Sequence, residues 1–196
     1  GPVHNNLQHV VVDGSRIWAN SNGAGVSRFD GASWRNWPSG CCGAAQDTSF
    51  VNPVGAFTLH RDRTGRKWFA FWGVAVERYD DSVDPPHVDR LVLAGGGPDS
   101  LYNHTAMWAS AHDDSGYVYL GGDTWDRGGR PPVGIDVYAP DGTLRAVWKT
   151  TNTGTPDNQV SALVVDTLRH RIWAGFAGKG VAWASTFGHK DSTKFQ

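Results

Sequence analysis

Apolar and polar positions along the chain follow one pattern that occurs four times. Each occurrence is a short apolar segment, a turn led by an aspartate, and a second short segment that carries an aromatic residue. The four occurrences span residues 10–20, 58–71, 109–122 and 162–175. Short apolar runs bounded by turn residues are typical of strands, so each occurrence predicts a β-hairpin.

Two landmarks repeat with the same period of about 50 residues. The turn aspartates are Asp13, Asp62, Asp113 and Asp166, and the aromatic residues are Trp18, Trp68, Tyr119 and Trp173. Because both landmarks keep one period, the chain contains an internal repeat. No segment shows a sustained helical period.

Each repeat continues with two more predicted strands. The third strands, at 25–30, 74–80, 134–140 and 180–185, alternate apolar and polar residues with period two. Turns such as Asp30-Gly31 and Asp141-Gly142 follow, since Asp-Gly is a strong hairpin signal. The fourth strands are predicted at 33–37, 87–93, 144–149 and, more weakly, 192–196.

A repeat of about 50 residues with four strands in meander order is the signature of a β-propeller blade. The first repeat carries a more specific set: Asp13, Gly14, Ile17, Trp18, Gly25, Val26, Arg28, Phe29, Asp30 and Gly31. On these residues the chain resembles the two-component-regulator propeller repeat of bacterial sensor and extracytoplasmic proteins. The resemblance weakens in the second and third repeats, where Val74 and Gly134 begin the third strand.

We therefore expect an all-β fold, a β-propeller in one domain over residues 1–196. Its four-stranded antiparallel blades are predicted at 7–37, 56–93, 107–149 and 160–196. An open arc of four blades would expose apolar faces at both ends, and large apolar patches are uncommon in water. The expectation is a segment of a larger propeller, or one that another chain closes into an eight-bladed ring. The alternative is a compact four-bladed ring.

The composition and charge of the chain limit the classes of partner that are expected to bind it. Of 196 residues, 18 are Lys or Arg and 19 are Asp or Glu, so the formal net charge is −1. Without a basic excess no nucleic acid is expected as a partner, and no apolar run is long enough to predict membrane insertion. The 25 glycines and 10 tryptophans fit short strands joined by tight turns.

The connections separate into two classes. In a meander blade, the turns between first and second and between third and fourth strands lie at one end, and nearly all of these are tight here. The opposite end receives the long connections at 38–55, 94–106, 122–133 and 150–159. Binding residues are concentrated on long loops that a rigid scaffold positions, so this end is the predicted ligand face, with ordinary linkers between blades as the alternative.

Within these loops an aromatic and charged set forms the candidate ligand site. Trp125 stands between Asp123 and Asp126, and an exposed Trp among such charges can stack on a sugar or a planar ligand. The alternative is a Trp that folds back to plug the loop. The predicted ligand-binding residues are Trp125, Asp126, Arg127, Arg130, Trp72, Tyr102 and His104.

Other tryptophans and the two cysteines have different interpretations. Trp18, Trp68 and Trp173 share one repeat position and are predicted to pack in the core between blades. Trp34, Trp37 and Trp148, on outer strands, are predicted to be half-buried. Cys41 and Cys42 are adjacent, and free thiols, a vicinal disulfide or a bond to another chain all remain open.

Catalytic patterns are few. His60 with Asp62 and His112 with Asp113 could suggest a metal site, but the histidines precede their turn aspartates by different offsets and should point to opposite faces. No Ser-His-Asp order, P-loop or dinucleotide loop occurs. Glu77 is the sole glutamate, which excludes a paired-glutamate glycosidase. No catalytic residue, metal or cofactor is predicted.

The sequence thus predicts a non-catalytic propeller module that binds a ligand or protein partner through its long-loop face, in an extracytoplasmic or sensor protein. The partner is another chain, a second copy or the rest of a longer chain that closes the propeller, and a small molecule or sugar is the candidate ligand. One alternative is a propeller enzyme of lyase or quinoprotein type with a His or metal centre at His104 or His112. Another is a structural subunit that assembles through blade edges.

Overall fold

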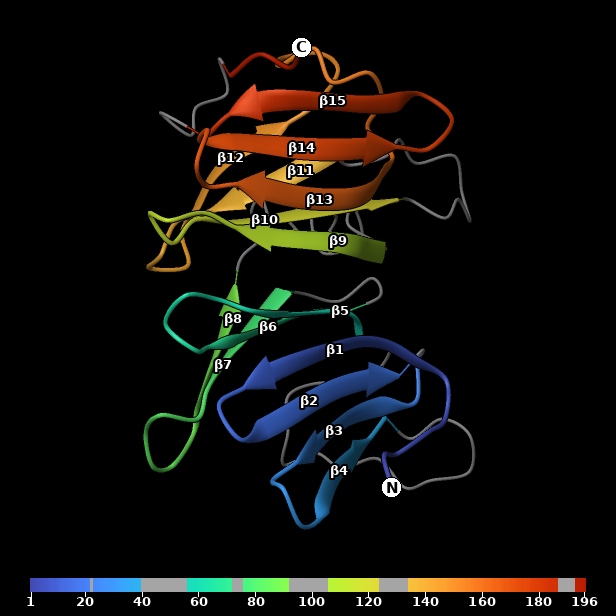
Figure 1. The fold of residues 1–196 in the computed structure, drawn as a ribbon, viewed down its shortest axis with the longest axis vertical. Coiled ribbons are helices and arrows are strands. Elements are labelled where there is room, and N and C mark those ends of the chain that lie inside the picture. The colour runs from blue at the N-terminus through green and yellow to red at the C-terminus, as the bar shows by residue number, and fades with distance from the viewer. Residues whose placement is uncertain (22, 40–55, 72–75, 92–105, 124–133, 187–192) are drawn as a thin grey trace. The chain divides into compact units, whose positions relative to one another are not determined.

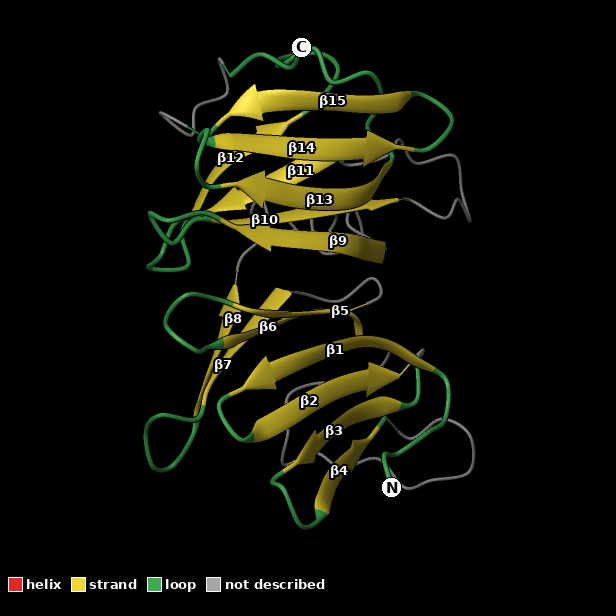
Figure 2. Cartoon of the chain, viewed as in Figure 1, coloured by secondary structure: helices red, strands yellow, loops and turns green. Residues whose placement is uncertain are grey.

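The computed structural model describes residues 1–21, 23–39, 56–71, 76–91, 106–123, 134–186 and 193–196 (Figure 1). Every regular element in these ranges is a β-strand (Figure 2). The chain divides into two compact units, Gly1–Arg90 and Leu91–Gln196, referred to as unit 1 and unit 2. Each unit contains two antiparallel sheets and is described by itself.

Unit 1 is built from two four-stranded meanders. The first sheet has the order β1 (Leu7–Asp13), β2 (Arg16–Ser21), β3 (Gly25–Phe29), β4 (Trp34–Pro38). The second has the order β5 (Ala56–Arg61), β6 (Lys67–Phe71), β7 (Val76–Asp80), β8 (His87–Leu91). Each strand pairs with its neighbour in sequence, as the repeat predicts.

Unit 2 repeats the arrangement. Its first sheet contains β9 (Ala106–His112), β10 (Val118–Asp123), β11 (Gly134–Tyr138) and β12 (Leu144–Trp148), and its second contains β13 (Val160–Asp166), β14 (Arg171–Phe176) and β15 (Gly180–Ser185). Beside β15, Trp183 and Gln196 exchange two backbone hydrogen bonds of 3.0 and 2.8 Å. Within residues 193–196, the weakly predicted fourth strand is thus reduced to this single pair. The predicted all-β propeller architecture is confirmed.

The core of unit 1 lies between its two sheets. Trp18, Val26 and Trp37 of the first sheet face Leu59 and Phe69 of the second. The Trp18 and Trp37 rings stack with centroids 5.5 Å apart and planes 2° apart. Burial of such large aromatic side chains supplies much of the stability of a sheet pair.

The core of unit 2 has the same construction. Tyr119, Ile135 and Trp148 pack against Ile172 and Phe176 of the following sheet. Strands β10 and β13 approach closely where β10 carries Gly121, because a Cβ there would lie 2.5 Å from Val160 Cγ1. A glycine at this point lets the second sheet pack directly on the first.

Three tryptophans depart from their predicted burial. Trp37 and Trp148 are fully buried rather than half-buried, because they stack on Trp18 and Tyr119 of their own sheets. Trp173 is only half-buried, so its prediction as a core residue is wrong. It lies on the face of its sheet opposite Ile172, away from the core of unit 2. Trp34 is half-buried and Trp68 fully buried, as predicted.

The length of the first hairpin turn decides what its aspartate binds. Where Asp and aromatic residue are six apart, the carboxylate accepts a hydrogen bond from the ring: Trp68 Nε1 donates to Asp62 at 2.8 Å and Tyr119 Oη to Asp113 at 2.7 Å. The turn after Asp13 is one residue shorter, and Asp13 instead accepts from Lys67 of the second sheet. The turn after Asp166 is one residue longer, and Asp166 accepts from Arg169 inside the turn.

Candidate functional site

The predicted ligand residues belong to loops outside the described ranges. Trp72 lies in 72–75, Tyr102 and His104 in 92–105, and Trp125, Asp126, Arg127 and Arg130 in 124–133. Cys41 and Cys42 also lie outside the described residues. The structure describes the strands on either side of these loops.

In unit 2 the connections meet at one end of the sheets. The 149–159 connection between β12 and β13 hydrogen-bonds to the first residue of β11, with Gly134 N donating to Asn158 O at 2.9 Å. It also bonds the turn after β14, where Ala177 N donates to Gln159 O at 3.1 Å. Gly134, the first residue of β11, therefore lies beside the 149–159 connection, at the end of the sheets that the meander topology assigns to long loops.

The 149–159 connection is fixed by its own side chains. Asn152 Oδ1 accepts from Lys149 N at 2.7 Å, and Asn152 Nδ2 donates to Val147 O at 2.8 Å. Asn158 Oδ1 accepts from Thr150 N at 2.8 Å, and Thr153 Oγ1 donates to Lys149 O at 2.8 Å. These bonds hold the 149–159 connection in one conformation beside Gly134, the first residue of β11.

A β-bulge recurs in the first strand of each of the four sheets, at the end away from the hairpin turn. The pairing register of β1, β5, β9 and β13 shifts at the same distance before the turn aspartate. The residues that the register skips are Gln8, Phe57, Trp108 and Ser161. Bulges redirect side chains and are frequent beside binding sites, and the residue at this bulge in β9 is Trp108.

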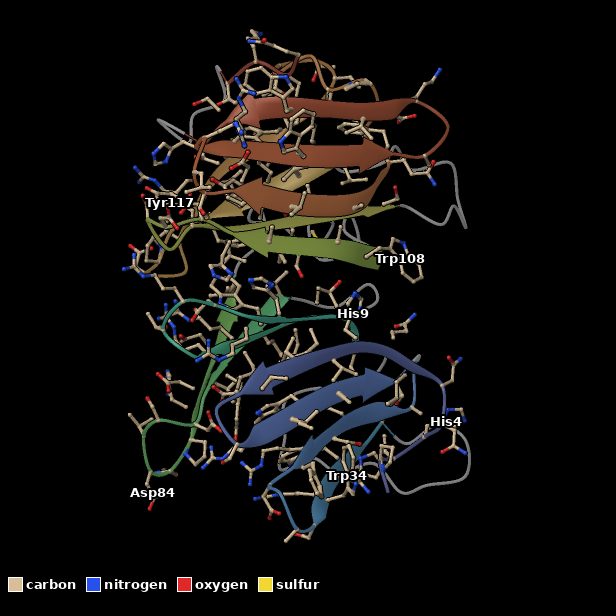
Figure 3. All side chains as sticks on the ribbon, in the orientation of Figure 1. His4, His9, Trp34, Asp84, Trp108 and Tyr117 are labelled. Carbon is tan, nitrogen blue, oxygen red and sulfur yellow. The ribbon has the colours of Figure 1, made fainter. Side chains whose placement is uncertain are left out.

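Trp108 is the member of this set that sequence reasoning missed. It is half-buried, and Figure 3 shows it at the end of β9 opposite the hairpin turn that carries Tyr117. The signal was the spacing of Trp108 from Asp113, which equals that of Gln8 from Asp13. Trp108 gives the candidate face an aromatic side chain within the described residues.

At the opposite end, the turn carboxylates are engaged in local structure. Asp62 Oδ1 accepts from Thr64 N and Arg66 N, and Asp30 accepts from the backbone of Ala32 and Ser33. Hydrogen bonds from the Ser33 and Ala32 backbone lower the pKa of Asp30 to about 2. Carboxylates held this way stabilise turns.

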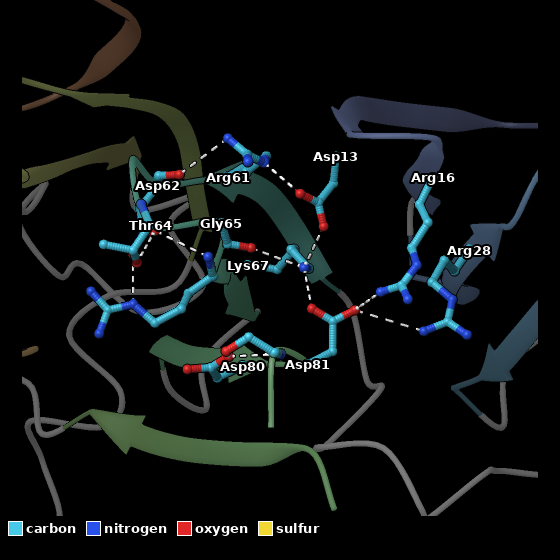
Figure 4. Close-up of polar contacts among 12 residues, drawn as sticks. Asp13, Arg16, Arg28, Arg61, Asp62, Thr64, Gly65, Lys67, Asp80 and Asp81 are labelled. Atoms are coloured by element: carbon cyan, nitrogen blue, oxygen red, sulfur yellow. Dashed lines mark hydrogen bonds and ion pairs between the residues drawn. The ribbon is translucent and has the colours of Figure 1, made fainter. Parts of the chain in front are cut away.

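The turn end of unit 1 also contains an ion-pair network, which we call the inter-sheet network (Figure 4). The Lys67 ammonium, 1% exposed, bonds Asp13 of the first sheet at 2.7 Å and Asp81 of its own sheet. Its other members, all paired with these two carboxylates, are Arg16, Arg28 and Arg61. Because each charge faces an opposite one, the network joins two sheets.

Sequence reasoning did not identify this network. Lys67 occupies the repeat position of Ile17, Val118 and Ile172, directly before the aromatic landmark. Asp81 stands where the first repeat has Gly31. These two substitutions, one in an apolar position and one in a turn, were the available signal.

One carboxyl has a strongly raised pKa. Burial raises the pKa of Asp136 to about 7, although the nearby Lys149 charge and Tyr138 hydroxyl act to lower it. Asp136 is fully buried in β11. A carboxyl without access to solvent is out of reach of a substrate, so its ionisation bears on stability.

Metal-binding chemistry has little basis in the described part of the chain. No group of three or more His, Cys, Asp or Glu side chains gathers there into a cation site. His60 pairs with Trp68, whereas His112 pairs with Val118, the residue before the aromatic landmark. The two histidines therefore occupy opposite faces of the repeat, as their spacing predicts. His104, the other histidine of the enzyme alternative, lies outside the described ranges.

Solved structures with a similar fold are propellers of different function. The extracellular domain of a hybrid two-component system from B. thetaiotaomicron matches 97% of this chain and 21% of its own, with 14% identity and a TM-score of 0.66. Virginiamycin B lyase from Staphylococcus aureus matches 91% of this chain and 55% of its own, with 10% identity and a TM-score of 0.55. YCF48 bound to D1 peptide matches 97% and 51%, with 15% identity and a TM-score of 0.54.

These matches establish the β-propeller fold and its structural similarity to the extracellular propellers of two-component systems. The chain spans about a fifth of the sensor domain and about half of the other two proteins. No protein-family model and no curated protein sequence matches the chain. Within the described ranges, no helix has the length and hydropathy needed to cross a membrane.

Proposed function

We propose that this chain is a non-catalytic β-propeller module that binds a ligand or protein partner through its long-loop face. The observation that carries the proposal is the bulge at the loop end of the innermost strand in all four sheets. A bulge interrupts the hydrogen bonds between two strands, and bulges are frequent beside functional sites. Its recurrence at the same position of each repeat therefore supports a binding role for this end of the sheets. Trp108 is the aromatic side chain that this bulge redirects in unit 2.

The contrast between the two ends of the sheets supports the same proposal. The described carboxylates at the turn end bind their own turns or the neighbouring sheet, as Asp62 and Asp13 do. At the loop end, the 149–159 connection is hydrogen-bonded to Gly134, the residue that follows segment 124–133 in the sequence. Trp125, Asp126, Arg127 and Arg130 belong to that loop.

The remaining predicted site residues extend the proposed face to the other loops. Trp72 precedes β7, and Tyr102 and His104 precede β9, each within a connection at the loop end. An aromatic set with two arginines and a carboxylate suits a sugar or another ligand with a flat apolar side and polar edges. We place the module in an extracytoplasmic protein, in keeping with the fold it shares with a sensor's extracellular domain.

The test is a binding measurement with a defined panel of neutral and acidic oligosaccharides. Intrinsic tryptophan fluorescence and ligand-observed NMR detect the binding. Trp108→Ala and Trp125→Ala should each weaken binding about tenfold or more with little change in stability. Leu168→Ala is the matched control, because Leu168 is exposed in the turn between β13 and β14, at the other end of the sheet. Binding that both tryptophan variants retain would refute the loop face as the site.

A further inference from the structure

Both sheets of unit 1 carry an arginine directly opposite the aromatic landmark. Arg28 of β3 pairs with Trp18, and Arg78 of β7 pairs with Trp68. We propose that Arg28 and Arg35 of β4 bind a doubly charged tetrahedral oxyanion, a phosphate or sulfate group, at the turn end of unit 1. This site lies at the end of the sheets away from the long loops and is independent of the function proposed above.

The second sheet shows what this arginine binds when the repeat supplies its partner. Arg78 Nε donates to Asp89 Oδ2 at 2.9 Å, and Asp89 belongs to β8, the strand beside β7. The Arg78 guanidinium lies 5.7 Å from the centroid of the Trp68 ring. The outer strand of the second sheet thus provides a carboxylate for an arginine that lies over an indole ring.

The first sheet has the same arginine without that carboxylate. The Arg28 guanidinium lies 5.5 Å from the Trp18 centroid and 5.9 Å from the Trp37 centroid. Its cross-strand partner in β4 is Arg35, whose guanidinium lies 4.8 Å from the Trp37 centroid. The sequence of β4 contains no acidic residue. Two like charges directly opposite each other in a ladder are unfavourable, and a bound anion relieves this repulsion.

Asp81 approaches Arg28 but is already bound by other cations. The distance from Arg28 Nη1 to Asp81 Oδ2 is 3.7 Å, which is too long for a hydrogen bond. Asp81 Oδ2 accepts from Arg16 at 2.8 Å, and Asp81 Oδ1 accepts from Lys67 (Figure 4). Asp81 therefore compensates Arg16 and Lys67 more strongly than it compensates Arg28.

Asp30, which follows β3, is also occupied. Its carboxylate accepts from the backbone of Ala32 and Ser33 in its own turn. Arg28 Nε is buried, and no hydrogen-bond acceptor reaches it within the described part of the chain. Arg28 thus has donors to spare at a site where the side chain is still 20% exposed.

The Tyr79 hydroxyl marks the point around which the arginines gather. Burial raises the pKa of Tyr79, and Asp81 adds to this rise, whereas the charges of Arg28, Arg35 and Arg16 act to lower it. All three guanidinium groups are therefore close enough to act on one hydroxyl. Because Asp81 is hydrogen-bonded to Arg16, the charges of Arg28 and Arg35 are the ones left for a ligand.

The chemistry of the pair selects the ligand. A guanidinium group presents parallel N–H donors that match the oxygens of carboxylates and phosphates. Stacking on indole rings holds the guanidinium plane and leaves its N–H edge available to oxygen atoms. A single carboxylate satisfies one arginine, as Asp89 does for Arg78. Two adjacent arginines are matched by a group that carries two negative charges.

The experiment is isothermal titration calorimetry of the 196-residue chain at constant ionic strength, with inorganic phosphate, inorganic sulfate and acetate as the probes. Phosphate or sulfate should bind with a Kd of about 1 mM, and acetate about tenfold more weakly. The tighter of the two tetrahedral ions identifies the group, a phosphate or a sulfate ester. Acetate that binds as tightly as both would overturn the requirement for two charges.

Substitutions at an exposed position locate the binding. Arg35→Gln should weaken binding of the tetrahedral ions about tenfold or more. Arg145→Gln is the matched control, because Arg145 is an exposed arginine of the outer strand β12 and β11 beside it contains no arginine. It removes the same charge and should bind like the unmodified chain. Equal losses in the two variants would show that the ions respond only to net charge and would overturn the proposal.

Arg35→Asp tests the comparison between the two sheets. This change gives the first sheet a carboxylate on its outer strand, as Asp89 provides in the second. The variant should abolish binding of the tetrahedral ions and raise the midpoint of urea denaturation. Retained binding in this variant, or no saturable binding by the unmodified chain, would overturn the proposal. Trp108→Ala and Trp125→Ala should leave phosphate binding unchanged, so failure here and failure of the proposed function are separate results.

Discussion

The Lys67 ammonium lies 2.7 Å from Asp13 Oδ2, across the boundary between the two sheets of unit 1. Lys67 starts β6 in the second sheet, whereas Asp13 ends β1 in the first. The ammonium also lies 5.1 Å from the centroid of the Trp18 ring. The buried Lys67 ammonium thus contacts Asp13 and Trp18 of the first sheet and also Asp81, in a turn of the second sheet.

Replacement of Lys67 by the residue of the other repeats should destabilise the protein. In Lys67→Ile, the side chain matches Ile17 and Ile172, but Asp13 and Asp81 lose their shared cation at a poorly solvated site. We expect a loss of about 3 kcal/mol in the free energy of unfolding, because Asp13 and Asp81 lose their buried shared cation and keep only the arginines at the edge of the network. Urea denaturation followed by tryptophan fluorescence measures it.

Adding Asp81→Gly should recover part of this loss. The double variant restores both residues of the first repeat, Ile17 and Gly31, and removes one of the two like charges. It should be about 1–2 kcal/mol more stable than Lys67→Ile, since an apolar replacement of an ion pair is often nearly neutral. A double variant no more stable than the single one would show that Lys67 does not balance Asp81.

The same aromatic substitution should have different effects in the first and last repeats. Trp18→Ala removes a fully buried ring that stacks on Trp37 and should cost about 3–5 kcal/mol. Trp173→Ala, at the same repeat position but half-buried, should cost about 1 kcal/mol. Equal losses in chemical denaturation would show that Trp173 is covered within the single chain.

This comparison shows what a repeat predicts and what it does not. The spacing of Asp13, Trp18 and their equivalents specified the strands and their order, because strand periodicity and turn chemistry are local properties. The burial of Trp173 is not local, since it depends on which sheet covers its face. Sequence position alone therefore predicted a core residue where the structure has a half-exposed one.

The candidate site divides in the same way. Topology predicted that the 150–159 connection lies at the same end of the sheet as the start of β11, and the hydrogen bond from Gly134 N to Asn158 O agrees with it. The bulge at Trp108 was not recognised, because an inserted residue changes the register without interrupting the apolar pattern. Trp125 and its neighbours remain predictions.

The buried carboxyl of Asp136 should make the free energy of unfolding depend on pH between about pH 4 and 7. Burial raises the pKa of Asp136 to about 7, while an unfolded aspartate ionises near its ordinary value. In this interval the unfolded chain has lost the proton that the folded chain keeps, so the free energy of unfolding falls as pH rises. The fall is at most about 1.4 kcal/mol per pH unit, and it ends above the folded pKa, where both states are ionised.

Asp136→Asn should flatten this fall. The amide is nearly isosteric and keeps an oxygen that can accept from the Tyr138 hydroxyl, but it does not ionise. Urea denaturation at several values from pH 4.5 to 8 should show the variant gaining on the unmodified chain as pH rises. Parallel curves for the two proteins would mean that Asp136 does not carry the dependence. Asp13 and Asp62 do not confuse the comparison, because their lowered pKa values act below this interval.

The turn aspartate of the second sheet should be among the least replaceable carboxylates. Asp62 Oδ2 accepts from Trp68 Nε1 at 2.8 Å, and Asp62 Oδ1 accepts from Thr64 N at 2.9 Å and Arg66 N at 3.0 Å. Asp62→Ala leaves the buried indole N–H without this acceptor, which should cost about 2–4 kcal/mol. Asp62→Asn should cost nearly as much if its amide nitrogen takes the Oδ2 position, because two donors then face each other. Asp141→Asn, in an exposed turn whose carboxylate accepts from Thr143 N, is the matched control and should cost less than about 1 kcal/mol.

Acid should reveal the same contact. Burial raises the pKa of Asp62, but hydrogen bonds from Trp68 and Thr64 outweigh it, and the pKa lies below the ordinary 3.8. A carboxyl whose folded pKa is depressed stabilises the fold above its unfolded pKa, and this stability is lost as pH falls through the folded pKa. Asp62→Asn should therefore lose less stability than the unmodified chain between about pH 4 and 2. If both proteins lose equal stability over that range, the hydrogen bond from Trp68 does not hold Asp62 ionised. The proposed relation between the length of the turn and the hydrogen bond from the aromatic residue to the aspartate would then fail for this sheet.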